Sequence, residues 1–108
     1  MSARDAYRAI ADPTRREILE LLRDRGRLAA GRIAECFPEV ARPGISRHLR
    51  VLRECGVVSC TRTGKNLHYQ LESEPLDEIR DHWLATFSGA SRRSLSALRK
   101  QAEARDRY

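Results

Sequence analysis

The spacing of apolar residues changes at Gly56 from a helical period to a strand period. Before Gly56, apolar residues recur three and four positions apart, as on the buried face of a helix. We expect four helices there, at about residues 3–11, 13–24, 28–37 and 43–55. After Gly56, two stretches rich in β-forming residues, 57–62 and 67–71, flank a polar tetrapeptide that contains glycine, which predicts a β-hairpin. The chain is therefore predicted to be mainly α-helical with one small hairpin.

Helix-terminating residues support these boundaries. Asp12 is suited to cap a free backbone N–H at a helix start, and Pro13 fits the first helical position. Gly26 and Gly56 are suited to end the second and fourth helices. In the third helix Leu28 is expected to face inward. Two helices joined by a short turn and followed by a hairpin make a winged helix-turn-helix (α-α-α-α-β-β-α).

A last helix is predicted from Pro75 to about residue 100, because apolar residues continue at helical spacing. Such a helix is too long for a small domain to cover, so we expect it to pack on a second copy of the chain. The expected interface residues are Leu76, Ile79, Trp83 and Phe87. Trp83 and Phe87 would alternatively line a pocket for an organic ligand, although aromatic residues at helical spacing usually pack in interfaces. Residues 1–100 thus form one domain, with a bend expected near Gly89 and a polar tail at 101–108.

The excess positive charge lies in one quarter of the chain. The whole chain has a formal net charge of +6, and residues 42–65 hold six basic residues against the single acid Glu54. With Ile45, Leu49 and Leu52 as the buried stripe, Arg47 and Arg50 project from the opposite face of the fourth helix. A basic recognition helix followed by a basic hairpin tip is typical of a surface that binds duplex DNA.

Other classes of protein fit the composition less well. No apolar run is long enough to cross a bilayer, and the N-terminal residues lack the apolar core of a signal peptide. A cytoplasmic protein is therefore expected, with its three cysteines as reduced thiols. The sequence contains no glycine-rich phosphate loop and no arrangement typical of a catalytic triad, so we expect no enzyme activity.

Several segments resemble those of one family of repressors. Residues 11–19 read Ala-Asp-Pro-Thr-Arg-Arg-Glu-Ile-Leu, residues 42–52 read Arg-Pro-Gly-Ile-Ser-Arg-His-Leu-Arg-Val-Leu, and residues 62–65 read Arg-Thr-Gly-Lys. In order and spacing, these segments are similar to the opening, recognition helix and wing of ArsR/SmtB repressors. The family resemblance implies a homodimer that places two recognition helices in adjacent major grooves of a pseudo-palindromic operator.

The same resemblance assigns residues to the DNA interface. On the recognition helix they are Arg42, Pro43, Ser46, Arg47, His48 and Arg50, and in the wing they are Arg62, Thr63, Lys65 and Asn66. Ser46, Arg47 and His48 match the positions that face base edges. For His48, a phosphate contact or a half-buried spacer stays an alternative. Many relatives carry a helix-capping serine where this chain has Ala41.

The usual metal sites of this family are absent from the sequence. The Cys-x-Cys positions of arsenic sensors correspond to Ala30 and Arg32, and the last helix has Asp81 and His82 but no later histidine. We therefore expect no metal and no cofactor. Cys36, Cys55 and Cys60 are interpreted as small apolar residues, and a thiol or soft-metal sensor built on Cys55 and Cys60 is the alternative. A winged helix that docks a protein rather than DNA is a further alternative.

Overall fold

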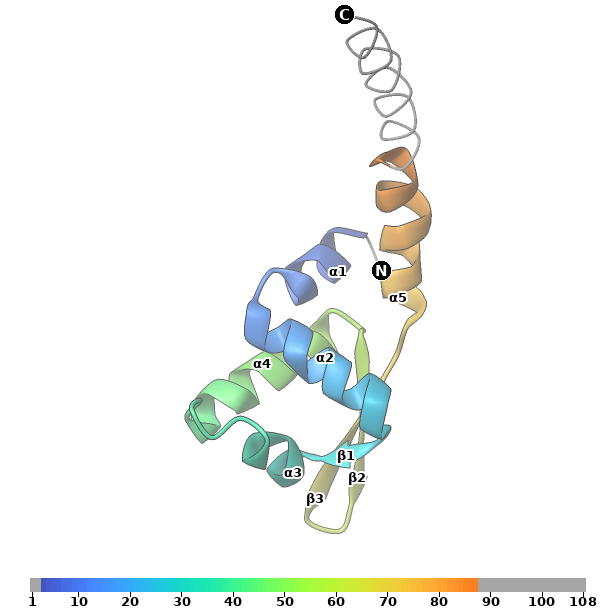
Figure 1. Cartoon of the computed structure of the whole chain (residues 1–108). Helices are drawn as coiled ribbons and strands as arrows, with labels where there is room; N and C mark the ends of the chain where they lie inside the picture. The colour runs from blue at the N-terminus through green and yellow to red at the C-terminus, as the bar shows by residue number, and fades with distance from the viewer. Residues whose placement is uncertain (1–2, 88–108) are drawn as a thin grey trace, which may run out of the picture. The chain divides into compact units, whose positions relative to one another are not determined.

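The computed structural model describes residues 3–87 (Figure 1). In chain order the elements are α1 (Ala3–Ile10), α2 (Pro13–Arg25), β1 (Leu28–Ala29), α3 (Ala30–Glu35), α4 (Arg42–Glu54), β2 (Val58–Thr63), β3 (Asn66–Leu71), α5 (Glu74–Glu78) and the π-helical segment η1 (Ile79–Leu84). The chain divides into two compact units, Met1–Asp77 and Glu78–Tyr108. The first unit holds the four predicted helices and the predicted hairpin, which confirms the mainly helical fold.

The connection between α1 and α2 is held by the motif that opens α2. The Asp12 carboxylate accepts a hydrogen bond from the Arg15 backbone N–H at 3.1 Å, as predicted for an N-cap. The Arg15 guanidinium donates back to the carbonyls of Arg8 and Ala9, at 2.8 and 3.0 Å. Arg16 donates likewise to the Ile10 carbonyl at 2.8 Å. These arginines therefore satisfy the last carbonyls of α1, which have no partner within their own helix.

Helix α4 begins without a side-chain cap. Ala41 occupies the N-cap position and makes no side-chain hydrogen bond. The first turn of α4 also lies close to the preceding loop. A Cβ at Gly44 would lie 3.1 Å from Val40 Cγ1. A larger residue at position 44 would therefore force Val40 to shift.

The β-structure is a three-stranded sheet rather than a hairpin alone. The strand order is β1-β3-β2 with antiparallel pairing. Leu28 and Ala29 pair with Tyr69 and His68 of β3, so the prediction that helix three begins at Leu28 is wrong. Pairing with β3 satisfies backbone groups at the edge of the hairpin, and it keeps Leu28 extended. Gly26, at φ 75°, ends α2 and turns the chain toward this strand.

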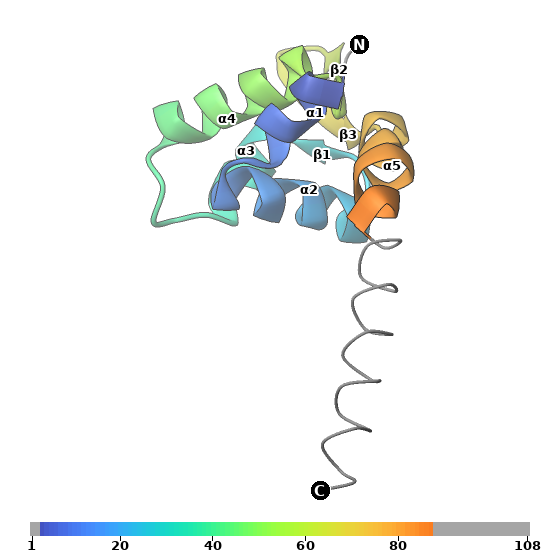
Figure 2. The same cartoon turned by 90° about the horizontal axis from the view of Figure 1, so that it is seen from above.

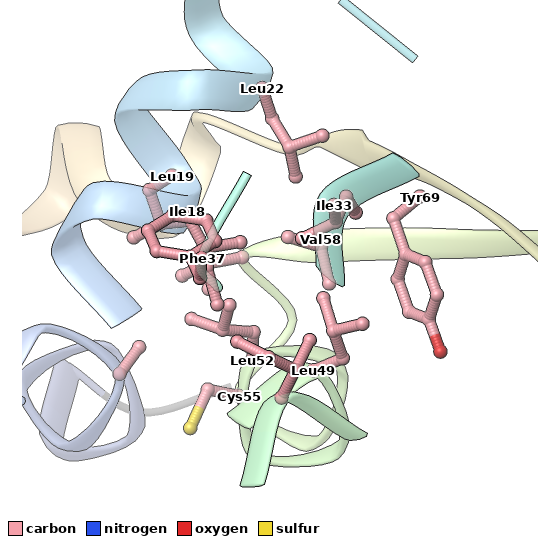
Figure 3. Close-up of a cluster of buried hydrophobic side chains, with 13 residues drawn as sticks. Ile18, Leu19, Leu22, Ile33, Phe37, Leu49, Leu52, Cys55, Val58 and Tyr69 are labelled. Atoms are coloured by element: carbon pink, nitrogen blue, oxygen red, sulfur yellow. The ribbon is translucent and has the colours of Figure 1, made fainter. Parts of the chain in front are cut away.

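A single apolar core holds the first unit together (Figure 3). Helix α1 contacts both α2 and α4, which also contact each other (Figure 2). The predicted stripe of α4 is buried, with Ile45, Leu49 and Leu52 exposed by 2% or less. From the other elements the core takes Ala9, Ile18, Leu19, Leu22, Ile33, Phe37, Cys55, Val57, Val58 and Tyr69. Because one face of α4 is fixed in this core, its opposite face must point outward.

The C-terminal segment differs from the predicted uniform helix. It starts at Glu74, and after five α-helical residues it continues as η1 over Ile79–Leu84. The expectation of one regular α-helix from Pro75 is therefore wrong within residues 74–87. A π-helical turn changes the number of residues per turn, and nothing in the apolar spacing signals it. The predicted bend at Gly89, the rest of the helix to residue 100 and the tail lie outside the described residues. Within residues 3–87, no helix combines the length and the apolar character needed to cross a membrane.

Candidate nucleic-acid interface

The outer face of α4 carries five of the six recognition-helix residues that the family resemblance assigned to DNA. Arg42, Pro43, Ser46, Arg47 and Arg50 are all exposed. Four of these residues, Pro43, Ser46, Arg47 and Arg50, line one open hollow on the surface of the helix. The structure thus brings them together on the side of α4 that faces away from the core.

The arginines of this face have no acidic partner within the described part of the chain. Arg42, Arg47 and Arg50 form no ion pair and no side-chain hydrogen bond with residues 3–87. Elsewhere in the same range, Arg8 pairs with Glu54 at 3.3 Å and Arg23 with Asp24 at 2.8 Å. A guanidinium carries five N–H donors in a fixed fork. The α4 face therefore offers charged donors suited to guanine edges and phosphates.

The β2–β3 turn extends the basic surface. Arg62, Thr63, Lys65 and Asn66 are all exposed, and Figure 1 shows the hairpin tip extending beyond α3. Gly64 has a positive φ of 63° at the tip, a conformation that other residues rarely adopt. The two cations of the tip are thereby carried on a tight turn away from the apolar core.

His48 lies differently from its neighbours on α4. Its side chain is 19% exposed, and its Nε2 lies 3.8 Å from the Asp12 carboxylate. Its Nδ1 lies 3.4 Å from Nη1 of Arg15. The structure therefore places His48 against the start of α2, as in the half-buried alternative, while Arg47 and Ser46 are exposed. Its position beside Leu49 in the apolar stripe was the signal available in the sequence.

Comparison with known proteins decides the family. A model of the helix-turn-helix domain matches residues 10–61. The transcriptional repressor SdpR of Bacillus subtilis is 42% identical over 84 residues, which cover 77% of this chain and 89% of that protein. The chain belongs to the ArsR/SmtB family.

Solved structures agree with this assignment. A crystal structure of an ArsR family transcriptional regulator matches with a TM-score of 0.71 and 28% identity, covering 82% of this chain and 89% of that one. An ArsR-like regulator from Rhodococcus sp. RHA1 matches with a TM-score of 0.68 and 29% identity, over 93% and 92% of the two chains. The predicted winged helix-turn-helix is thus confirmed. This ArsR/SmtB protein is a DNA-binding transcriptional regulator, and its family and fold are not those of enzymes.

The positions that hold arsenic in some ArsR/SmtB sensors do not fit a metal in this chain. Ala30 has no donor atom, and Arg32 is an exposed cation 3.7 Å from Glu35. Within the part of the chain that the structure describes, no group of three or more His, Cys, Asp or Glu residues could hold a metal ion. Asp81 and His82 are exposed neighbours in η1.

The three cysteines have different surroundings. Cys36 is exposed, Cys55 is buried and Cys60 is half-buried, and all three are free thiols. Burial raises the pKa of the Cys55 thiol above its ordinary value. Cys60 is the cross-strand partner of Tyr69. The pKa of Tyr69 is raised mainly by its burial, and the neighbouring Cys60 thiol adds to this effect.

The expected interface residues differ in exposure. Leu76 packs against the core of the first unit, and Ile79 is buried. Trp83, Leu84 and Phe87 are exposed by 46%, 45% and 52%. The rings of Trp83 and Phe87 lie 4.7 Å apart between centroids in an edge-to-face arrangement, the geometry that aromatic pairs prefer.

Proposed function

We propose that this protein is a homodimeric repressor that binds a pseudo-palindromic operator without a metal switch. In each subunit, α4 enters the major groove and the β2–β3 turn contacts the flanking backbone. The observation that carries this proposal is the exposed α4 face, where Arg42, Arg47 and Arg50 have no acidic partner among residues 3–87. An arginine that can bond both O6 and N7 of guanine discriminates against other bases by about 1–3 kcal/mol.

The exposed apolar residues of the terminal segment support the homodimer. Trp83, Leu84 and Phe87 each expose close to half of their surface. Large apolar groups clustered on a surface are typical of interaction sites, and identical subunits most often meet across a two-fold axis. A two-fold axis would present the two α4 helices to half-sites about one helical turn of DNA apart.

Regulation without metal rests on the residues at the family's sensor positions. A soft metal or arsenite needs two or three converging thiolates, and α3 offers Ala30 and Arg32 where arsenic sensors have cysteines. Cys36 follows α3 as an exposed thiol, whereas Cys55 is buried. We therefore propose that operator occupancy does not respond to zinc or arsenite.

Selection of binding sites from a random duplex library tests the proposal. We expect enrichment of an inverted repeat whose half-site centres lie about 10–10.5 base pairs apart. Addition of zinc or arsenite should leave the Kd for the selected duplex unchanged. An asymmetric selected site would contradict the homodimer, and release by zinc or arsenite would contradict the absence of a metal switch. Failure to enrich any sequence would favour a protein-docking role.

A further inference from the structure

A basic residue outside both DNA-binding motifs lies at the wing. Arg27, in the turn between α2 and β1, is 36 positions from Thr63, and its Nη2 donates a hydrogen bond to the Thr63 hydroxyl oxygen at 3.2 Å. Both residues are exposed. Leu28, which follows Arg27, pairs with β3 of the same sheet. The turn before β1 therefore adds a third cation to a surface whose other cations, Arg62 and Lys65, come from the hairpin.

Within residues 3–87, no acidic side chain forms an ion pair with Arg27. In the same part of the sequence, Nε of Arg23 lies 2.8 Å from Oδ1 of Asp24, and Nη1 of Arg32 lies 3.7 Å from Oε2 of Glu35. Arg27 has no such ion pair among residues 3–87, where its side-chain hydrogen bond goes to the neutral hydroxyl of Thr63. Because the hydrogen-bond partner of this exposed cation is neutral, no neighbouring anion offsets its field, and the cation can attract an anionic ligand.

The direction of the hydrogen bond leaves donors available on both residues. Arg27 uses one of the five guanidinium N–H groups to reach Thr63. The Thr63 oxygen accepts this bond, so its own O–H remains free to donate. Together the two side chains present N–H and O–H donors at one point. The oxygens of a DNA phosphate accept such bonds from arginine and threonine.

We propose that Arg27 and Thr63 act as a pair that binds a phosphate of the DNA backbone beside the wing. This inference rests on the proposed function, because it assumes that the β2–β3 turn lies against DNA. The pair would strengthen binding to any duplex sequence, since a phosphate contact carries no base information. It would also fix the wing on the backbone through a residue that no wing motif contains.

Salt-dependent binding to a random-sequence 30-base-pair duplex tests the pair in the full-length protein. Each phosphate contact contributes about 0.9 to the slope of log K against log salt concentration. Arg27→Ala should therefore reduce the magnitude of this slope by about 0.9 for each subunit bound. Arg27→Lys should keep most of the slope but lose affinity, because an ammonium lacks the fork that reaches both Thr63 and a phosphate. Arg25→Ala, an exposed arginine on the last turn of α2, is the matched control and should leave the slope unchanged.

A double-mutant cycle with Thr63→Val shows whether the two side chains act as a unit. The combined loss of affinity in Arg27→Ala with Thr63→Val should be smaller than the product of the two single losses. Additive losses, or an Arg27→Ala slope equal to that of the wild type, would overturn the inference while leaving the proposed function intact. Absence of salt-dependent duplex binding by the wild-type protein would overturn both.

Discussion

At the residue scale, the basic side chains of the proposed DNA interface divide into those suited to bases and those suited to phosphates. Arg47 projects from the middle of the α4 outer face, whereas Lys65 lies at the tip of the β2–β3 turn. A recognition helix in the major groove meets base edges, and a hairpin beside it meets the backbone. The two residues should therefore affect specificity differently.

Arg47→Ala should weaken operator binding by about 1–3 kcal/mol per half-site and relax the preference for the contacted base. Lys65→Ala should weaken operator and random DNA to a similar extent and lower the magnitude of the salt slope by about 1 for each subunit bound. Fluorescence anisotropy with both duplexes measures these effects. An equal loss on operator and random DNA for Arg47→Ala would contradict base recognition by this residue.

The contrast between Arg47 and His48 shows what a sequence can predict about such a site. The helical period and the apolar stripe were enough to predict that Arg47 and Arg50 point away from the core. The surroundings of His48 depend on Asp12 and Arg15, which the fold brings beside α4 from a distant part of the sequence. The same limit applies to Arg27, because its bond to Thr63 joins residues 36 positions apart.

The cysteines should differ in reactivity in the folded protein. Cys55 is 1% exposed, and burial raises the pKa of its thiol, so little thiolate forms near neutral pH. Cys36 is exposed. Iodoacetamide at pH 7.5 should therefore alkylate Cys36 at least about ten times faster than Cys55, as mass spectrometry of the peptides would measure. Equal rates would revive the hypothesis of a thiol sensor at Cys55.

At the element scale, helices that carry their own start and stop signals were predictable. The start of α2 at Pro13 and the apolar stripe of α4 follow from local sequence. Strand β1 was missed because it is two residues long and is held by β3. The π-helical η1 was missed because residues that pack at α-helical spacing give no sign of a wider turn.

The starts of α2 and α4 offer opposite tests of capping. Asp12→Ala should lower the free energy of unfolding by about 1 kcal/mol, while Asp12→Asn, which keeps an acceptor oxygen, should lower it less.

Ala41→Ser should raise the free energy of unfolding by about 0.5–1 kcal/mol, because Ala41 leaves the start of α4 without a side-chain cap. Urea denaturation measures all three variants. Ala41→Val is the control, and a stabilisation equal to that of Ala41→Ser would contradict the capping explanation.

At the scale of the whole molecule, the proposed DNA-binding surface and the proposed dimer interface lie in different parts of the chain. The basic excess lies within residues 42–65, and the exposed aromatic residues lie beyond residue 80. A dimer that joins two DNA-binding units would double the number of phosphate contacts made by one complex. Its affinity for DNA should therefore depend on both the salt concentration and the protein concentration.

Replacement of Trp83 and Phe87 by alanine should weaken the dimer without unfolding the first unit. Both side chains are about half exposed, so their loss removes little from the core. Sedimentation equilibrium should show a dimer dissociation constant raised by at least about tenfold, since burying an aromatic side chain contributes about 1.5–3 kcal/mol. Glu74→Gln, at an exposed residue of α5, should dimerise like the wild type. An unchanged dimer in the double variant would place the interface elsewhere.

The most direct measurement is the affinity of the wild-type protein for the duplex selected from the random library, compared with a scrambled duplex of equal length, over a series of salt concentrations. We expect tighter binding to the selected duplex at every salt concentration, by about 10³-fold or more, and a steep loss of affinity for both duplexes as salt rises. Equal affinity for the two duplexes would contradict specific binding at this site. Binding that does not depend on salt would contradict a DNA interface made by the exposed arginines of α4.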